Sequence, residues 1–140
     1  MSPVRAAATL TAALLAGCTH RTPPEPRIHY TVGAAYQARG IWHYPEESVR
    51  YDKTGLGVVE AGSPRLTADG ERYDPDAMAG AHRTLPLPSV ARVTDLDTGR
   101  QVLVRLNDRG PDDPGRLIAL TPRAASLLGI PSGGEARVRV

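Results

Sequence analysis

Residues 89–107 constrain the fold more than any other part of the chain, because apolar and polar side chains alternate on both sides of a turn signal. The alternation covers residues 90–95 and again residues 102–107, which is the pattern of strands with one face buried. Between them, Asp97-Thr98-Gly99 has the composition of a tight turn. The stretch therefore predicts a β-hairpin.

Short elements are expected on both sides of the hairpin. Strands are predicted at residues 55–60, 117–120 and 136–140, and one or two helical turns at residues 75–80. Thr121 followed by Pro122 has the pattern of a helix start, and Gly129 has that of its end. The chain has 14 Gly, 13 Pro and no Phe, so many turns and a core of Val, Leu, Ile and Ala are expected. Together these signals predict a mainly β chain folded as a small closed barrel with one or two short helices.

The first 18 residues have the pattern of a bacterial lipoprotein signal. Residues 6–16 form an unbroken run of Ala, Thr and Leu that suits a secretory signal and is too short for a membrane span. The run ends in Leu15-Ala16-Gly17-Cys18, and Cys18 is the only cysteine. We therefore expect a signal peptide at residues 1–17 and lipidation of Cys18, which would tether the protein to a membrane. The alternative is a plain signal peptide with an incidental free thiol.

The remaining chain divides into a tether, an arm and one domain. Residues 18–27 contain three prolines and are predicted to form a tether behind the lipidated Cys18. Residues 28–54 hold all but one of the aromatic side chains and are predicted to form an N-terminal arm, which either packs around the domain or offers a platform for sugar stacking. Residues 55–140 are expected to form the barrel domain, and the chain to be a monomer.

Charge and ligand spacing limit the partners. The formal net charge is +2 and the Arg residues are scattered, so no nucleic-acid partner is expected. The His and acidic residues have no metal-ligand spacing, so no metal and no cofactor are expected either. Thr19, where an Asp would favour the inner membrane, favours an anchor in the outer membrane, with the domain facing the periplasm.

Three segments carry polar groups that a plain barrel would not need: residues 67–74, 81–86 and 106–111. Asp108 follows a predicted hairpin strand and precedes Gly110-Pro111, which forces a turn. A side chain at such a place is held by a strand and faces the loops. The residues alone favour structural roles, with Asp108 as a turn residue, Glu71 as an exposed charge and His82 as a packing residue.

The same segments carry a resemblance to a known family. They read TADGERYD, GAHRTLPL, ARVTDLDTGRQVLVRLNDRGP and GRLIALTPRAASLLG, in this order from Thr67 to Gly129. This series resembles the rare lipoprotein A family, whose domain is a six-stranded double-psi β-barrel. Because the chain ends at Val140, we expect it to lack the sporulation-related repeat domain of some relatives.

The resemblance implies an endolytic lytic transglycosylase, a carbon–oxygen lyase that cleaves the MurNAc–GlcNAc bond of peptidoglycan strands and leaves a 1,6-anhydro end. The family's activity residues map onto Glu71, His82 and Asp108. Asp108 is expected to be the acid that protonates the glycosidic oxygen and, as a carboxylate, the group that accepts the C6 proton. Glu71 would be its carboxylate neighbour or would stabilise the positive charge of the transition state, and His82 would orient a carboxylate or bind the sugar.

The motif neighbours Asn107, Arg109 and Arg83 are expected to bind the substrate, although Asn107 and Arg109 also suit structural roles.

The chain departs from the family pattern near the expected cleft. Val58 and Val59 stand where the family carries Trp and Tyr, Ala119 where it carries Asp, and Asp112 where it carries Phe. The alternative is therefore a non-catalytic wall-binding lipoprotein, expansin-like or a decayed enzyme. A periplasmic adaptor with an unrelated partner is a third possibility.

Overall fold

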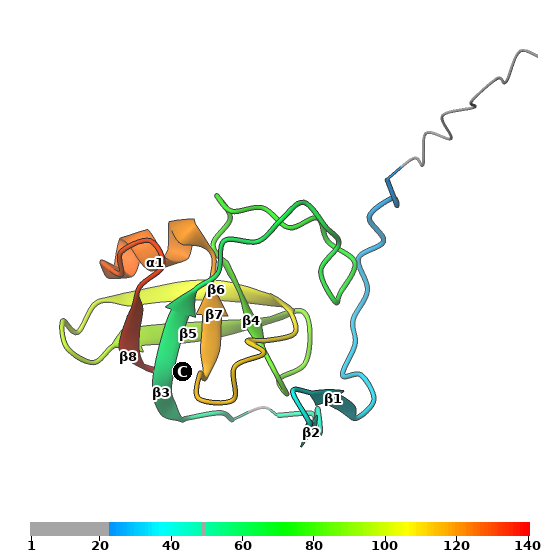
Figure 1. The fold of residues 1–140 in the computed structure, drawn as a ribbon, viewed down its shortest axis with the longest axis horizontal. Helices are drawn as coiled ribbons and strands as arrows, with labels where there is room; N and C mark the ends of the chain where they lie inside the picture. The colour runs from blue at the N-terminus through cyan, green and yellow to red at the C-terminus, as the bar shows by residue number, and fades with distance from the viewer. Residues whose placement is uncertain (1–22, 49) are drawn as a thin grey trace, which may run out of the picture.

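Six strands close into a barrel in the computed structural model, which describes residues 23–48 and 50–140 (Figure 1). The barrel strands are β3 (Thr54–Val59), β4 (Ala79–His82), β5 (Ser89–Asp95), β6 (Gln101–Asp108), β7 (Ile118–Leu120) and β8 (Glu135–Arg139). Their order around the barrel is β3-β7-β4-β6-β5-β8, so each strand is hydrogen-bonded to a neighbour on either side. The predicted mainly β fold with a six-stranded barrel is confirmed.

Two of the six strand pairs are parallel, and these pairs account for the long loops of the fold. β3 lies parallel to β7, and β4 lies parallel to β6. Parallel neighbours cannot be joined by a tight hairpin. The long loops instead join strands that are separated by another strand: residues 60–78 lead from β3 past β7 to β4, and residues 109–117 lead from β6 past β4 to β7. These two loops carry most of the polar groups described below.

The predicted hairpin is confirmed as the antiparallel pair β5 and β6, in register from Ser89 opposite Leu106 to Thr94 opposite Gln101. The Asp95 side chain closes the turn by accepting hydrogen bonds from the backbone N–H groups of Asp97 and Thr98. From this turn β6 runs to its last residue, Asp108.

The helix predicted after Thr121 is also confirmed. α1 spans Pro122–Leu128, Thr121 caps its start, and Gly129 ends it in the left-handed conformation that favours glycine. In contrast, the predicted helical turns at residues 75–80 are wrong, because this segment is a turn that leads into β4. Among the residues that the structure describes, no helix is long and apolar enough to cross a bilayer.

The core contains aliphatic side chains from every part of the barrel. Those with at most 1 % of their surface exposed are Leu87, Val93, Val104, Leu106, Ile118, Ala119, Leu120, Ala124, Ala125, Leu128 and Val138. Burial of this apolar surface is the main favourable contribution to folding. As predicted, the core is built without phenylalanine.

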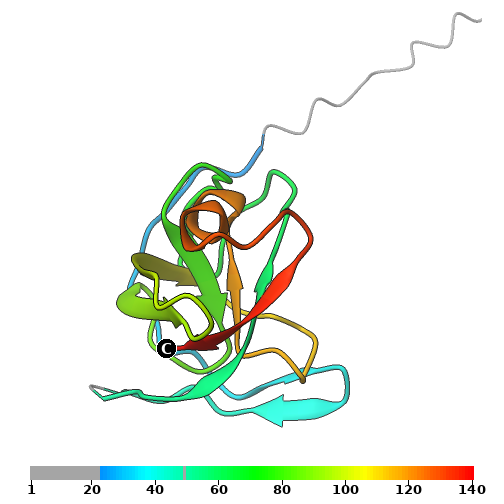
Figure 2. The ribbon, with the colours of Figure 1, turned by 90° about the vertical axis from the view of Figure 1, so that its left-hand side faces the viewer.

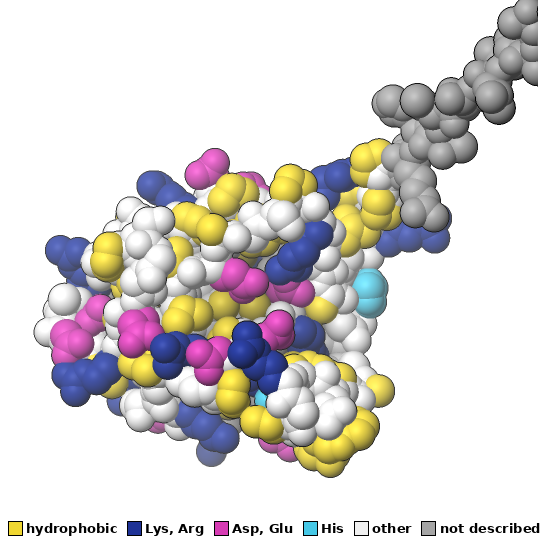
Figure 3. All heavy atoms as spheres, viewed as in Figure 1, with side chains coloured by type: hydrophobic (Ala, Val, Ile, Leu, Met, Phe, Trp, Pro, Cys, Tyr) yellow, Lys and Arg dark blue, Asp and Glu magenta, His cyan; other side chains and the backbone are white. Residues whose placement is uncertain are grey.

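The N-terminal arm runs along the outside of the barrel. Its backbone pairs with the loops at residues 69–70 and at Leu87, and it then forms a hairpin of β1 (Tyr36–Ala38) and β2 (Ile41–His43). This hairpin lies at the end of the molecule opposite α1 (Figure 2). Apolar side chains gather on its surface (Figure 3, lower right), and Trp42 is 56 % exposed. The arm therefore packs on the domain through its backbone and also presents exposed aromatic side chains. Cys18 and the predicted signal peptide lie outside the described residues.

Candidate active site

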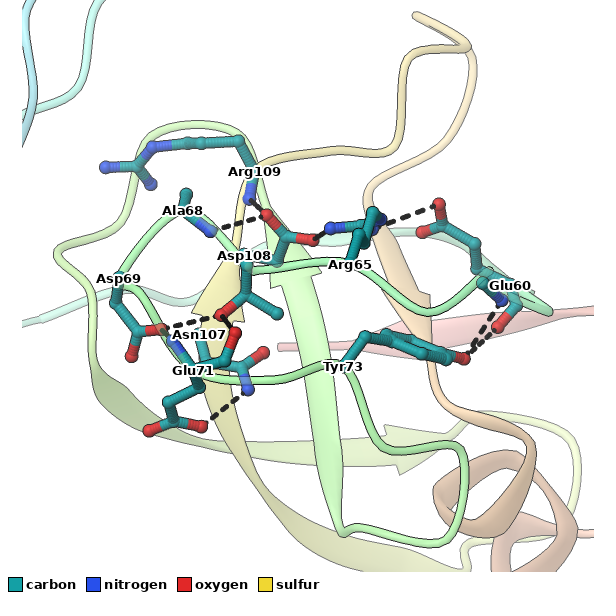
Figure 4. Close-up of polar contacts among 11 residues, drawn as sticks. Glu60, Arg65, Ala68, Asp69, Glu71, Tyr73, Asn107, Asp108 and Arg109 are labelled. Carbon is teal, nitrogen blue, oxygen red and sulfur yellow. Dashed lines mark hydrogen bonds and ion pairs between the residues drawn. The ribbon is translucent and has the colours of Figure 1, made fainter. Parts of the chain in front are cut away.

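Asp108, the last residue of β6, is surrounded by hydrogen-bond donors (Figure 4). Its Oδ1 accepts from the backbone N–H groups of Ala68 and Arg109, each at 2.9 Å. Its Oδ2 accepts from the guanidinium of Arg65. The side chain remains 11 % exposed, so it is held in place and still reached from the solvent. Three donors with one full positive charge are suited to a carboxylate anion.

The tight turn at residues 67–71 provides one of these donors. The Asp69 carboxylate accepts from the hydroxyl of Thr67 and the backbone N–H of Glu71, which folds the turn on itself. Gly70 has a φ of +86°, and a Cβ there would lie 2.1 Å from the carbonyl oxygen of Arg27. The Asp69 N–H then binds the carbonyl of the residue before Asp108. The turn is thereby fastened to β6, with the N–H of Ala68 facing the carboxylate.

Glu71 faces away from Asp108, on the other side of this turn (Figure 4). Its carboxylate accepts from Nδ2 of Asn107 at 2.8 Å and from the guanidinium of Arg105 at 2.6 Å. Burial alone would raise the pKa of Glu71, but these donors outweigh burial and hold the pKa below its ordinary value. Glu71 is thus a fixed anion that binds the turn to β6, and none of its hydrogen bonds or ion pairs joins it to Asp108.

His82 is a buried ring at the end of β4, with 3 % of its surface exposed. Its Nδ1 accepts from the backbone N–H groups of Thr84 and Leu85, each at 3.2 Å. The proton therefore lies on Nε2, which donates to the Tyr51 hydroxyl at 2.9 Å. The ring thus binds the arm and the backbone of its own loop, and it reaches neither Asp108 nor Glu71.

The pKa of His82 is lowered from 6.5 to about 4. Burial is the largest cause, and the positive charges of Arg109, Arg83 and Lys53 add to it. The imidazole is therefore neutral at neutral pH, which suits a structural donor and acceptor.

Arg109 and Arg83 point their guanidinium groups at backbone carbonyls. Arg109 donates to the carbonyls of His82, Leu85 and Val32, and so connects the loop after β6 to β4 and to the arm. Arg83 donates to carbonyls of the loop at residues 113–116. The two arginines hold the loops around the site, and their donors are largely used within the protein.

A cleft opens beside Asp108. It has a volume of about 480 Å³, within the range of small-molecule binding clefts. Its wall is formed by Val58, Val59, Glu60, Arg65, Asp108, Arg109, Gly110, Pro111, Asp112 and Ala119. A smaller, deeper hollow adjoins it and shares Glu60, Arg65, Asp108 and Ala119 with it, while Tyr73 and Asn107 line the deeper part. Of the three predicted catalytic residues, only Asp108 lines these two hollows.

Glu60 and Arg65 form part of the cleft that the sequence did not single out. Glu60 follows β3, and its backbone is fixed at both ends because its N–H binds the carbonyl of Leu120 and its carbonyl accepts from the Tyr73 hydroxyl. Its carboxylate oxygen lies 3.9 Å from Nη2 of Arg65, whose Nη1 binds Asp108. Arg65 therefore lies between two carboxylates (Figure 4).

Glu60 lies in surroundings that disfavour its charged form. Burial raises the pKa of the Glu60 carboxyl above its ordinary value. The Arg65 cation opposes this rise, whereas the anionic side chains of Asp108 and Asp112 add to it. The local sequence gave one usable signal, a carboxylate next to the end of a strand.

Comparison with known families decides the identity of the domain. A family described as lytic transglycolase, with a double-psi β-barrel domain, matches residues 51–140. The chain belongs to this family. The match confirms the resemblance to rare lipoprotein A and identifies the barrel as a double-psi β-barrel.

Proteins named endolytic peptidoglycan transglycosylase RlpA are similar to this chain. One from Pseudomonas aeruginosa (strain UCBPP-PA14) is 55 % identical over 122 residues, which cover 84 % of this chain and 35 % of that protein. One from Neisseria meningitidis is 38 % identical over 117 residues, covering 81 % and 49 %. One from Escherichia coli K12 is 37 % identical over 114 residues, covering 79 % and 32 %. The chain thus spans less than half the length of these relatives.

The described part of the chain offers no group of three or more His, Cys, Asp or Glu side chains arranged to hold a metal ion.

Proposed function

We propose that this chain is an endolytic peptidoglycan transglycosylase that cleaves the MurNAc–GlcNAc bond and forms a 1,6-anhydro end. The observation that carries the proposal is Asp108, a carboxylate held by three donors on the wall of an open cleft. The names of its relatives support the same activity and substrate.

The reaction suits a small site because the nucleophile belongs to the substrate. The C6 hydroxyl of the muramoyl sugar attacks its own C1, so no water has to be positioned by the enzyme. An intramolecular nucleophile in the right geometry has a large advantage over one from solution. Asp108, as a carboxylate, accepts the C6 proton and stabilises the positive charge that develops near C1.

We assign Glu71, Asn107 and His82 the role of positioning this carboxylate. Glu71 binds Asn107, the residue before Asp108, and so fixes the end of β6. His82 fixes the end of β4, whose neighbour Ala81 is paired with Asp108. Loss of either residue is therefore expected to reduce activity through the placement of Asp108.

Arg83 and Arg109 shape the substrate-binding side of the cleft by holding the loops at residues 109–116. Arg109 lines the cleft itself and is the one of the two that can contact the glycan directly.

The protein is proposed to act in the cell envelope as a monomer anchored by lipid at Cys18, facing the periplasm and attached to the outer membrane. The pattern at residues 15–18 supports this placement. Replacement of Cys18 by Ser should abolish incorporation of a labelled fatty acid. A labelled Cys18→Ser protein would contradict the anchor.

The activity is tested by incubating the full-length protein, purified in detergent, with isolated glycan strands. Mass spectrometry should detect new 1,6-anhydromuramoyl ends at internal cleavage sites. Asp108→Asn should abolish them, with an unchanged circular dichroism spectrum. Reducing ends in place of anhydro ends would show hydrolysis and contradict the proposal.

A wall-binding protein without catalysis is the second candidate. It is favoured by Val58, Val59 and Ala119, which line the cleft where family members carry aromatic and acidic side chains. In this case the same incubation would retain protein on the glycan in a sedimentation assay and produce no new ends.

A further inference from the structure

Two carboxylates face one cleft from opposite sides of a single guanidinium. Glu60 and Asp108 both line the open cleft and the deeper hollow that adjoins it. Arg65 contacts both, through Nη1 on the Asp108 side and through Nη2, at 3.9 Å, on the Glu60 side. The stacking of Arg65 on the ring of Tyr73, 5.6 Å from its centroid, keeps the cation between them.

The two carboxylates have opposite surroundings. Asp108 accepts three hydrogen bonds, two from backbone N–H groups and one from Arg65. Within the described residues, the Glu60 carboxylate accepts no hydrogen bond, and its neighbour Arg65 lies beyond hydrogen-bond distance. Partial burial raises the pKa of Glu60, and the Arg65 cation offsets only part of this rise. Of two neighbouring carboxyls, the one without hydrogen-bond donors and with a raised pKa is suited to donate a proton, and the one that accepts three hydrogen bonds is suited to accept a proton.

The reaction needs both roles. The leaving sugar departs as an alcohol, so its glycosidic oxygen must gain a proton, and the attacking C6 hydroxyl must lose one. A carboxylate whose two oxygens already accept three hydrogen bonds is poorly suited to the first task. Asp108 is well suited to the second.

We propose that Glu60 is the catalytic acid of this site and that Asp108 is its catalytic base. This inference rests on the proposed transglycosylase activity. The Glu60 carboxyl gives its proton to the glycosidic oxygen as the bond from that oxygen to C1 of the muramoyl sugar breaks. The C6 oxygen forms the new bond to C1 and loses its proton to the Asp108 carboxylate. No water is consumed, and a proton returns from Asp108 to Glu60 through solvent after the products leave.

Arg65 is a positioning residue in this scheme. Its guanidinium binds and orients the Asp108 carboxylate, and its charge limits the rise in the pKa of Glu60, so that the Glu60 proton can be released. The backbone bonds on either side of Glu60, from Leu120 and Tyr73, fix where its carboxyl enters the cleft.

The test uses the full-length protein in detergent and two substrates. One is the isolated glycan strand, whose leaving group needs a proton. The other is a 4-nitrophenyl glycoside of the GlcNAc–MurNAc disaccharide, whose leaving group departs without one. The variants are Glu60→Gln, Glu60→Asp and Asp108→Asn. Asp97→Asn is the matched control, because Asp97 is an exposed carboxylate paired with Arg137 on the β5–β6 turn.

Glu60→Gln should lower kcat on glycan strands by about 100- to 10,000-fold, the usual contribution of a general acid, with little change in KM. It should retain most of the rate on the nitrophenyl glycoside, whereas Asp108→Asn should lose both rates. The control Asp97→Asn should behave as the wild type. Glu60→Asp should keep a reduced rate and an alkaline decline in kcat/KM, and that decline should disappear in Glu60→Gln.

Two results would overturn the assignment of Glu60. The first is a glycan rate for Glu60→Gln equal to that of the wild type. The second is an equal loss on both substrates with an unchanged melting temperature, which would indicate a role other than proton donation. A wild-type protein inactive on both substrates would overturn the transglycosylase proposal and this inference with it, and is recognised before any variant is made.

Discussion

The buried His82 predicts a specific dependence of stability on pH. The pKa of this ring is about 4 in the folded protein and 6.5 when it is exposed to water. Between these values the unfolded chain binds a proton that the folded protein excludes, so the free energy of unfolding falls as the pH is lowered. The stability associated with the neutral ring is fully present above pH 6.5, and it is lost progressively down to about pH 4.

The size of the effect follows from the gap between the two pKa values. Each pKa unit corresponds to 1.36 kcal/mol, so the gap from 6.5 to about 4 sets an upper limit of about 3.4 kcal/mol. At pH 5 the same linkage gives a loss of about 2 kcal/mol relative to pH 7.5. Because only 3 % of the His82 surface is exposed, solvent screening reduces this value little.

The assay is urea unfolding of the wild type and of His82→Asn at several pH values. Asn retains an acceptor for the N–H groups of Thr84 and Leu85 but does not titrate. The wild type should therefore lose about 2 kcal/mol relative to this variant between pH 7.5 and pH 5. Contributions from every other titrating group cancel in the difference. Tyr51→Phe is the matched control, because it removes the hydrogen bond to His82 but keeps the titrating ring and its pH dependence.

A difference between wild type and His82→Asn that stays constant from pH 7.5 to pH 5 would refute this reasoning. It would mean that the ring is protonated, or is reached by water, in the folded protein.

Three further outcomes are expected. Arg65→Met should lower kcat/KM and move its alkaline decline to higher pH, because loss of the cation raises the pKa of Glu60 further; an unmoved decline would contradict the link between them. Thr121→Ala should lower the free energy of unfolding in urea by about 1 kcal/mol, since its Oγ1 caps α1 at the N–H of Ala124. Leu106→Ala should lower it by about 2–5 kcal/mol, because this fully buried side chain leaves a cavity in the core. A smaller loss would mean that the barrel collapses around the site.

The elements that the sequence predicted well are those whose signals are local. The β5–β6 hairpin follows from alternation and a turn, and both ends of α1 follow from Thr121, Pro122 and Gly129. The helix prediction for residues 75–80 was wrong because contacts with distant parts of the chain determine their structure. The Asp74 side chain accepts a hydrogen bond from the N–H of Asp76. The residues that follow form β4, which pairs with β6 and β7. Those partners are distant in the sequence, so propensity alone could not reveal them.

In the candidate site too, the positions predicted correctly are those with a local signal. Asp108 was placed beside a cleft because it ends a recognisable strand, and it lines that cleft. The directions of Glu71 and His82 depend on Arg105 and Tyr51, which bind them from other parts of the chain. The order of the motifs therefore predicted one shared site for residues whose side chains point in different directions.

Glu60, in contrast, lines the cleft but was not predicted as a site residue. It directly follows Val58 and Val59, which stand where the family pattern has aromatic residues, so no family motif marks its position. Its significance arises only when the loop at residues 60–73 folds back and Arg65 reaches Asp108. Val58, Val59 and Glu60 then form one stretch of the cleft wall, in which two aliphatic side chains adjoin the half-exposed carboxyl that we propose as the proton donor. A double variant that restores Trp and Tyr at positions 58 and 59 should therefore tighten glycan binding without replacing Glu60 in catalysis.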